Sequence, residues 1–271
     1  PKVLIYDEFV SPLEWLQEER TEWWAKLIPR NVLKLFYRIL LRRCKLVLAD
    51  TEAHVDYSSK ISGVPKSKFK SLPVGTDESI FKPAPKEYKQ AGNNGQQSDF
   101  RVFYYGSMLG LHGLDVVMDA ALKLKDQPIE FVFAGGGQQA KQAIAEYQGK
   151  GAKITHHEWI EYSDLPKFAY RSQLTLGGPF GVSAQAKRVI TGKTYQFLAC
   201  QTPVLIGQNL TSGLFIDKQN CLSIPLGDAH ALADKVIWAQ QHPAQLKSIA
   251  AAGRQLYDQN FSSSALATQM A

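Results

Sequence analysis

Two hydrophobic periods alternate along this chain. Short apolar runs, typical of buried parallel strands, are followed by longer segments in which apolar residues recur every three or four positions, as in helices. We expect strands over residues 3–6, 45–49, 69–74, 102–105, 130–134, 153–157, 174–176 and 203–207. We expect helices over residues 12–27, 31–43, 52–61, 114–125, 138–148, 164–169, 193–200 and 229–242. This strict alternation with short connections predicts an α/β fold, with a parallel sheet wrapped by helices.

A polar stretch divides the alternating pattern into two units. Residues 85–98 are rich in Gly, Asn and Gln and show neither period, which is typical of a linker. The domains that we expect are an N-terminal α/β domain over 1–84, a linker over 85–98, a Rossmann-like domain over 99–256 and a C-terminal helix or tail over 257–271. The chain begins at Pro1 without an initiator Met, and we expect a segment upstream of it.

Composition and charge narrow the class of protein. Hydrophobic residues make up 45% of the 271 positions and charged residues 21%, as in ordinary soluble proteins. The three cysteines (Cys44, Cys200 and Cys221) are widely spaced, which favours reduced thiols in a cytoplasmic protein. The net charge of +6 favours anionic partners such as nucleotides or acidic lipids.

Basic residues are concentrated between positions 26 and 45. Five of them recur every four residues and would line one helix face: Lys26, Arg30, Lys34, Arg38 and Arg42. The segment 26–43 fits either a core helix with a solvated cationic face or a helix that adsorbs to an acidic membrane surface, and both interpretations stay open. No nucleic-acid recognition motif accompanies the charge, so we expect no nucleic-acid partner.

The segment 176–207 carries the strongest indication of ligand chemistry. It combines five glycines with three cations, Lys187, Arg188 and Lys193, and it is poor in Asp and Glu. Gly192 precedes a short helix whose first backbone N–H groups have no partner within the helix. A bound anion relieves the mutual repulsion of clustered cations, so we predict a diphosphate site here. We expect Lys193 and Arg188 to be its catalytic cations, and Lys187, Gly192 and Thr194 to bind the donor.

Glycines also follow two strands of the expected sheet. In parallel sheets, ligands bind at the carboxyl ends of the strands, and glycine lets the backbone approach them closely. After the strands 102–105 and 130–134 we therefore expect donor contacts from Gly106, Ser107, His112, Gly113, Gly135, Gly136 and Gly137.

Strand 153–157 ends in two adjacent histidines, and the aromatic Trp159 follows it. Adjacent strand residues point to opposite faces, so His156 and His157 do not suit one metal ion, and we expect no metal site. His157, Trp159 and Ile160 instead suit a wall against a nucleotide base, although core packing explains Trp159 and Ile160 nearly as well.

From Phe69 onward the chain resembles the retaining family-4 (group 1) glycosyltransferases of the twin-Rossmann (GT-B) fold. The resemblance is carried by SLPVGTDESIFKP (71–83), VFYYGSMLGLHGLDVVMDAALKL (102–124), IEFVFAGGGQ (129–138) and KRVITGKTYQFLACQTPVLIG (187–207). It implies that the C-terminal domain binds a nucleotide-sugar. It also implies that residues 1–74 correspond to the later part of an N-terminal, acceptor-side domain, so that this domain is partial.

Several positions depart from the family pattern. The paired glutamates of its E-x7-E motif, which contact sugar and ribose, fall on Arg188 and Gln196. Gln196 keeps an acceptor for a ribose hydroxyl, and Arg188 is suited to phosphate. Ser107 and His112 stand where many members carry Arg and Lys, and Gln201 replaces a glycine.

The resemblance implies transfer of a sugar from a UDP- or GDP-sugar to an unknown acceptor, with retention of configuration and no metal or cofactor. The acceptor is a glycan, a lipid-linked saccharide or a small molecule, in polysaccharide biosynthesis. We expect a cytoplasmic protein, with peripheral membrane contact through helix 26–43 and a homodimer as further options.

Two alternatives stay open. One is a nucleotide-sugar epimerase or a sugar phosphorylase on the same fold. The other is a truncated or non-catalytic lobe that binds nucleotide without turnover, which the lost carboxylates support. Such a truncation would also expose apolar surface on the N-terminal unit.

Overall fold

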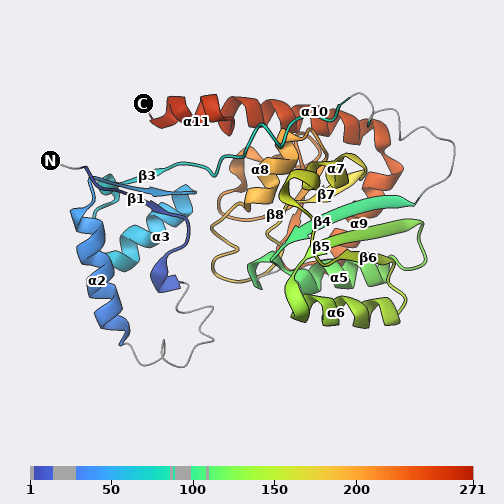
Figure 1. Cartoon of the computed structure of the whole chain (residues 1–271), viewed down its shortest axis with the longest axis horizontal. Helices are drawn as coiled ribbons and strands as arrows, with labels where there is room; N and C mark the ends of the chain where they lie inside the picture. The colour runs from blue at the N-terminus through green and yellow to red at the C-terminus, as the bar shows by residue number, and fades with distance from the viewer. Residues whose placement is uncertain (1–2, 15–28, 86–87, 89–98, 108–109, 271) are drawn as a thin grey trace. The chain divides into compact units, whose positions relative to one another are not determined.

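The computed structural model describes residues 3–14, 29–85, 88, 99–107 and 110–270. The chain forms two compact units, one over Pro1–Pro73 and the other over Val74–Gln269 (Figure 1). Residues 74–83, the crossing segment between the two units, thus belong to the second unit. The expected linker 85–98 lies almost wholly outside the described residues, so the domain limits drawn around it stay a prediction.

The first unit is built on a three-stranded parallel sheet. Its strands are β1 (Ile5–Glu8), β2 (Leu46–Ala49) and β3 (Phe69–Ser71), in the order β1-β2-β3. Between them run α2 (Arg30–Arg43) and α3 (Glu52–Ser62). The α3 helix begins where the Thr51 side chain accepts a hydrogen bond from the His54 backbone N–H, and it ends at Gly63 in the left-handed conformation. The expected helix 12–27 is described only at its first turn and otherwise lies outside the described residues.

A buried polar network lies at the carboxyl ends of β1 and β2. His54 Nδ1 lies 2.6 Å from Asp50 Oδ1, and its Nε2 lies 3.4 Å from Glu8 Oε1. Glu8 also accepts hydrogen bonds from the hydroxyls of Tyr37 and Ser58. Burial by itself lowers the pKa of His54, but the hydrogen bond with Asp50 and the close carboxylate of Glu8 raise it to about 9. A buried imidazolium therefore joins β1, β2 and α3.

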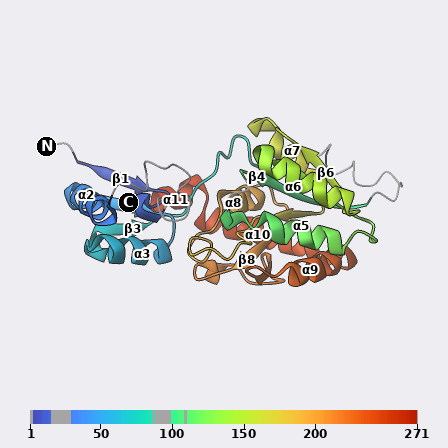
Figure 2. The same cartoon turned by 90° about the horizontal axis from the view of Figure 1, so that it is seen from below.

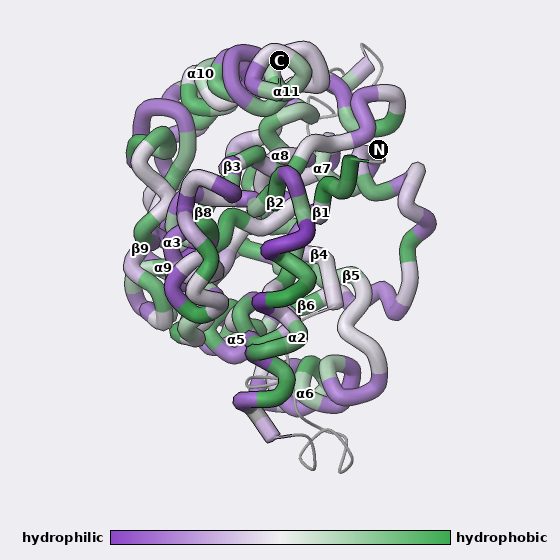
Figure 3. The backbone as a smooth tube through the Cα atoms, turned by 90° about the vertical axis from the view of Figure 1, so that its left-hand side faces the viewer, coloured by the Kyte–Doolittle hydropathy of each residue, from purple (hydrophilic) through white to green (hydrophobic). Residues whose placement is uncertain are grey.

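One face of α2 packs on this unit and the opposite face is exposed. Tyr37 and Leu41 are buried in the core. Five apolar side chains on the other side are exposed: Val32, Leu35, Phe36, Ile39 and Leu40. Figure 3 shows α2 as a tube on which apolar and polar positions alternate. These five side chains form an exposed apolar row on α2.

The second unit contains a six-stranded parallel sheet in the order β6-β5-β4-β7-β8-β9. The strands are β4 (Phe100–Gly106), β5 (Ile129–Gly135), β6 (Ile154–His157), β7 (Leu174–Leu176), β8 (Val204–Gln208) and β9 (Leu222–Pro225). The register pairs Gly106 with Gly135, so the two glycine turns lie side by side at the carboxyl edge. The predicted parallel sheet is confirmed.

Helices cover both faces of this sheet. They are α5 (Leu114–Lys123), α6 (Gly137–Gly149), α7 (Leu165–Tyr170), α8 (Gly192–Ala199), α9 (Ala229–Gln241) and α10 (Pro243–Asn260). Below the strands in Figure 1 lie α5 and α6, with α5 between α6 and α9 in Figure 2, while α7, α8 and α10 lie above. Successive side chains of β4 alternate accordingly: Val102 and Tyr104 join one core cluster and Phe103 the other.

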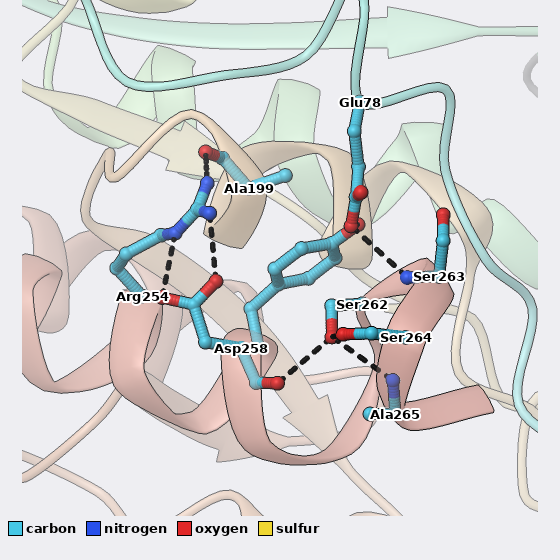
Figure 4. A network of polar contacts seen from close by, with 9 residues as sticks. Glu78, Ala199, Arg254, Asp258, Ser262, Ser263, Ser264 and Ala265 are labelled. Atoms are coloured by element: carbon cyan, nitrogen blue, oxygen red, sulfur yellow. Dashed lines mark hydrogen bonds and ion pairs between the residues drawn. The ribbon is translucent and has the colours of Figure 1, made fainter. Parts of the chain in front are cut away.

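The crossing segment is held to the C-terminal helices by Glu78. Its Oε1 accepts a 3.0 Å hydrogen bond from the Tyr257 hydroxyl and another from the Ser263 backbone N–H, at the start of α11 (Ser263–Met270) (Figure 4). Nearby, Arg254 pairs with Asp258 and also donates to the Ala199 carbonyl at the end of α8. The end of α8 is thereby fixed to α10.

Two elements, β9 and α10, were not expected from the sequence, and α11 falls within the expected C-terminal helix or tail over 257–271. The short strand β9 ends in Pro225, which is acceptable because β9 is an edge strand. The α10 helix extends well before the expected C-terminal tail at 257–271, and α11 follows it. Among the described residues, none of the helices combines the length and apolar character that a membrane span requires.

The His54 network predicts a specific pH dependence of stability. The folded pKa of about 9 lies above the ordinary 6.5, so the stabilisation is complete below pH 6.5 and is lost as the pH rises through 9. Between pH 6 and 10 the native chain should lose about 3 kcal/mol more unfolding free energy than His54→Gln, which carries no titrating ring. Urea denaturation at several pH values measures the difference, and parallel pH profiles of the two chains would contradict it.

Gln201 predicts a stabilising substitution. It follows α8 with φ of 56°, a left-handed conformation that is strained for a residue with a Cβ. Gln201→Gly should raise the free energy of unfolding by about 1 kcal/mol, whereas Gln201→Ala keeps the strain and should change it little. Thermal unfolding of both variants compares them, and equal melting temperatures would refute the strain.

Candidate functional site

The candidate site lies at the carboxyl ends of β4, β5 and β7, where the backbone segments approach each other closely. Gly106, Gly113 and Gly135 all have positive φ. A Cβ on Gly135 would lie 2.6 Å from the Gly106 carbonyl oxygen, and a Cβ on Gly113 would lie 2.5 Å from the Gly181 backbone nitrogen. These positions need glycine for packing, whatever ligand they contact.

Lys193 lies at the centre of this arrangement. It is the second residue of α8 and only 6% exposed, and its Nζ has no hydrogen-bond partner among the described residues. The Nζ lies 4.4 Å from the centroid of the Tyr104 ring, and a Cβ on Gly106 would lie 3.2 Å from it. Burial lowers the pKa of Lys193 to about 7. A buried amine without a countercharge therefore lies beside the first glycine turn.

His112 is brought to the same point from the next turn. It belongs to the short helix η3 (Gly110–His112), and its Cε1 would lie 3.6 Å from a Cβ on Gly106. Burial, and secondarily the charge of Lys193, lowers the pKa of His112 to about 3, so the imidazole is neutral. Its buried Nδ1 has no partner among the described residues, while the Tyr104 hydroxyl donates to its backbone carbonyl. Tyr104 was not among the site residues predicted from the sequence, although it lies in β4 only two positions before the predicted donor contact Gly106.

The three cations that are close in the sequence differ in environment. Lys193 is buried, Arg188 is half-buried and Lys187 is exposed. The turn that carries Arg188 is held by Asn209, whose Nδ2 donates to the carbonyls of Ala186 and Val189. The structure thus brings Lys193 and His112 together against Gly106, and it leaves Lys187 on the surface.

Thr194 and Gly192 have different surroundings from each other. Thr194 is fully buried, and its hydroxyl donates to the Gly178 carbonyl at 3.4 Å, so it holds the β7 turn and offers no open face to a donor. Thr191 donates similarly to Gly177. Gly192 has open space around its Cα, as the start of an anion-binding helix requires.

The second glycine turn opens α6. Gly135, Gly136 and Gly137 have φ of 90°, 91° and 64°, and Gly136 is the N-cap of the helix. Ser107 is exposed at the end of β4. The Gly135 carbonyl lies 2.9 Å from His156 Nε2, which ties this turn to the end of β6.

The expected wall for a base is only partly assembled. Trp159 is 75% exposed, Ile160 is half-buried against the core, and His157 packs edge-on against Phe168. Trp159 is therefore open to a ligand, whereas His157 and Ile160 also serve as packing residues.

Gln196 has its polar atoms in use. Its Oε1 accepts a hydrogen bond from the Tyr105 hydroxyl, and its Nε2 donates to the Tyr162 hydroxyl at 3.1 Å. A ribose hydroxyl that contacts Gln196 has to replace one of these two hydrogen bonds or form beside them. Neither tyrosine was predicted from the sequence as a partner of Gln196. Within the described part of the chain, no group of three or more His, Cys, Asp or Glu side chains is placed as metal ligands.

Comparisons with known proteins agree with this architecture. A family model described as "Glycosyl transferase-like" matches residues 118–271. No curated protein matches the sequence significantly. The structure of HepE from Anabaena in complex with UDP and glucose is similar, with a TM-score of 0.77 and 15% identity over 99% of this chain and 70% of that one.

Two further solved structures show the same fold. Sucrose-phosphate synthase from Thermosynechococcus elongatus has a TM-score of 0.77 and 16% identity over 98% of this chain and 65% of that one. The C-terminal domain of LpcC, a group 1 family glycosyl transferase from Francisella tularensis, has a TM-score of 0.55 and 15% identity over 70% of this chain and all of that one. The predicted Rossmann-like α/β fold is confirmed.

The glycine environments predict opposite responses to the same substitution. Gly113→Ala combines a φ of 62° with a Cβ placed 2.5 Å from backbone, and it should lower the free energy of unfolding by roughly 2 kcal/mol or more. Gly192→Ala meets nothing within 4 Å and should change it by about 0.5 kcal/mol or less. Urea denaturation compares the two variants, and an equally tolerated Gly113→Ala would refute the close approach.

Proposed function

The chain belongs to the glycosyl transferase-like family, and we propose that it transfers a sugar from a nucleotide-diphosphate sugar to an acceptor. The observation that carries this proposal is the buried Lys193 Nζ, which has no partner among the described residues and lies against Gly106. Burying such a group is unfavourable unless an anion binds it. A diphosphate at the carboxyl edge of the sheet supplies that anion.

In the proposed reaction, the bond between the anomeric carbon and the diphosphate oxygen breaks. A new bond to an acceptor oxygen forms on the same face of the sugar, which retains the configuration. The acceptor hydroxyl passes its proton to an oxygen of the diphosphate, which leaves with the bonding electrons. Lys193, Arg188 and the first backbone amides of α8 stabilise the charge that develops on the leaving group, without a metal ion.

The donor is proposed to be a UDP- or GDP-sugar. The solved structures of HepE contain UDP, UDP with glucose, or UDP-glucose, which supports a uridine nucleotide for the shared fold. Trp159 is exposed after β6 and is our candidate for the base contact.

The retaining family-4 subtype is part of this proposal, and two alternatives remain distinguishable from it. Arg188 and Gln196 stand where the family pattern has carboxylates, which favours a nucleotide-binding lobe without turnover more than an epimerase that needs acid–base groups. A chain that binds UDP but neither transfers nor hydrolyses UDP-sugar would be the non-catalytic lobe. Conversion of UDP-N-acetylglucosamine to an epimer without acceptor would identify an epimerase.

Acceptor-side contacts are proposed for the first unit. The α2 helix carries the exposed cations Lys34 and Arg42 as well as the exposed apolar row, which supports contact with an acidic membrane that carries a lipid-linked acceptor. A homodimer would cover the same row. Light scattering and vesicle sedimentation with the full chain separate these two possibilities.

Removal of the Lys193 charge tests the site. Lys193→Gln should weaken binding of UDP or GDP by about 1–3 kcal/mol, because the diphosphate loses its buried cation. The matched control is Lys167→Gln, which removes an exposed lysine of α7 that pairs with Asp164. Calorimetric titration measures both, and unchanged nucleotide affinity in Lys193→Gln would refute the role.

A further inference from the structure

The surroundings of Lys193 contain none of the groups that normally keep a buried lysine charged. No carboxylate pairs with its Nζ among the described ion pairs, and its Nζ donates no hydrogen bond to a described residue. Its Nζ lies over the ring face of Tyr104 and beside Gly106. A ring face attracts a cation far less strongly than water does, so it does not replace the lost hydration.

The titratable groups on the packed elements do not supply a countercharge. The β4 strand contributes Tyr104, whose pKa is raised by burial and, secondarily, by Asp115 of α5, so the phenol stays neutral. The η3 turn contributes the neutral His112. The ends of β5 and β7 carry Gly135 and Gly177, which have no ionisable side chain. The other ionisable group of α8, Tyr195, packs against Phe261.

We propose that Lys193 is largely uncharged in the empty protein above neutral pH and then takes up a proton when the diphosphate of the donor binds. The inference rests on the proposed function, because it requires an anion at this site. The proton comes from solvent and forms an N–H bond with the Lys193 lone pair. The resulting ammonium is then paired with a phosphate oxygen. Donor binding and protonation of Lys193 are therefore one coupled equilibrium.

The direction of the pH dependence follows from this coupling. Burial lowers the pKa of the free Lys193 to about 7, and the bound diphosphate raises it again. Below pH 7 the lysine already carries its proton, so affinity is highest there. Above pH 7 binding must recruit the proton, and affinity falls by about tenfold for each further pH unit until the pKa of the complex is reached. The donor site is thus sensitive to pH near neutrality.

The test measures proton uptake directly in the native chain. UDP-glucose is the probe, because its diphosphate is fully ionised and does not titrate between pH 6.5 and 8.5. A GDP-sugar replaces it if a thermal-shift screen shows that the site takes guanosine. Calorimetric titration at pH 8 in buffers of different ionisation enthalpy should show uptake of about 0.9 proton. Between pH 6.5 and 8.5 the affinity should fall roughly 20- to 30-fold.

The outcomes separate this inference from the proposed function. Binding without proton uptake at pH 8 overturns the inference and leaves nucleotide-sugar binding intact. Failure to bind any nucleotide-sugar overturns the proposed function and the inference with it. Lys150→Gln is the control, since Lys150 lies exposed after α6 and pairs with Glu146. It should take up the same fraction of a proton as the native chain.

Two measurements assign the proton to Lys193. In Lys193→Arg the guanidinium stays charged at every pH used, so binding should proceed without uptake, and the same uptake as in the native chain would overturn the assignment. If this variant does not fold, carbon NMR of the lysine Cε atoms in the native chain decides. One resonance should titrate near pH 7 in the free protein and no longer do so in the complex. Titration of every lysine above pH 9 in the free protein would overturn the proposal.

Discussion

The close approach of backbone segments at the carboxyl ends of β4, β5 and β7 is the constraint on which the candidate site depends. The register that pairs Gly106 with Gly135 brings two turns together, and a Cβ on Gly135 would meet the Gly106 carbonyl at 2.6 Å. Because there is no side chain at Gly106, the Lys193 Nζ and the His112 ring can both lie against it. The glycines therefore act first on packing, and the placement of the buried cation follows from that packing.

Most of the six-stranded sheet could be predicted from the sequence because its central strands are buried on both faces. Such strands are short apolar runs, and the observed β7 (Leu174–Leu176) coincides with the expected one. The β9 strand was not predicted, because its position at the edge of the sheet and its terminal proline weaken the apolar pattern. The α10 helix was not predicted, because it passes from one face of the sheet to the other. Leu246 and Ile249 pack into one core cluster and Leu256 and Tyr257 into the other, so its apolar residues do not form one stripe.

The candidate site could be predicted less completely, because closeness in sequence does not determine environment. Lys187 and Lys193 are six positions apart, yet one is exposed and the other is buried. Tyr105 and Gln196 are 91 positions apart, and their hydrogen bond depends on the fold. The contact of Glu8 with Ser58, 50 positions away, depends on the fold in the same way. Motif spacing finds the turns that surround a ligand, but it does not find partners that come from separate elements.

His54 and Lys193 show how the same physical requirement gives opposite results within one chain. Both groups are almost completely buried, which disfavours the charged form of each. His54 has carboxylates on both ring nitrogens, so the fold itself stabilises its charge, and the network adds to stability. Lys193 has no such partner among the described residues, so the fold bears the cost of desolvation without compensation. Under the proposed function, a diphosphate bound at the glycine turns would supply this compensation.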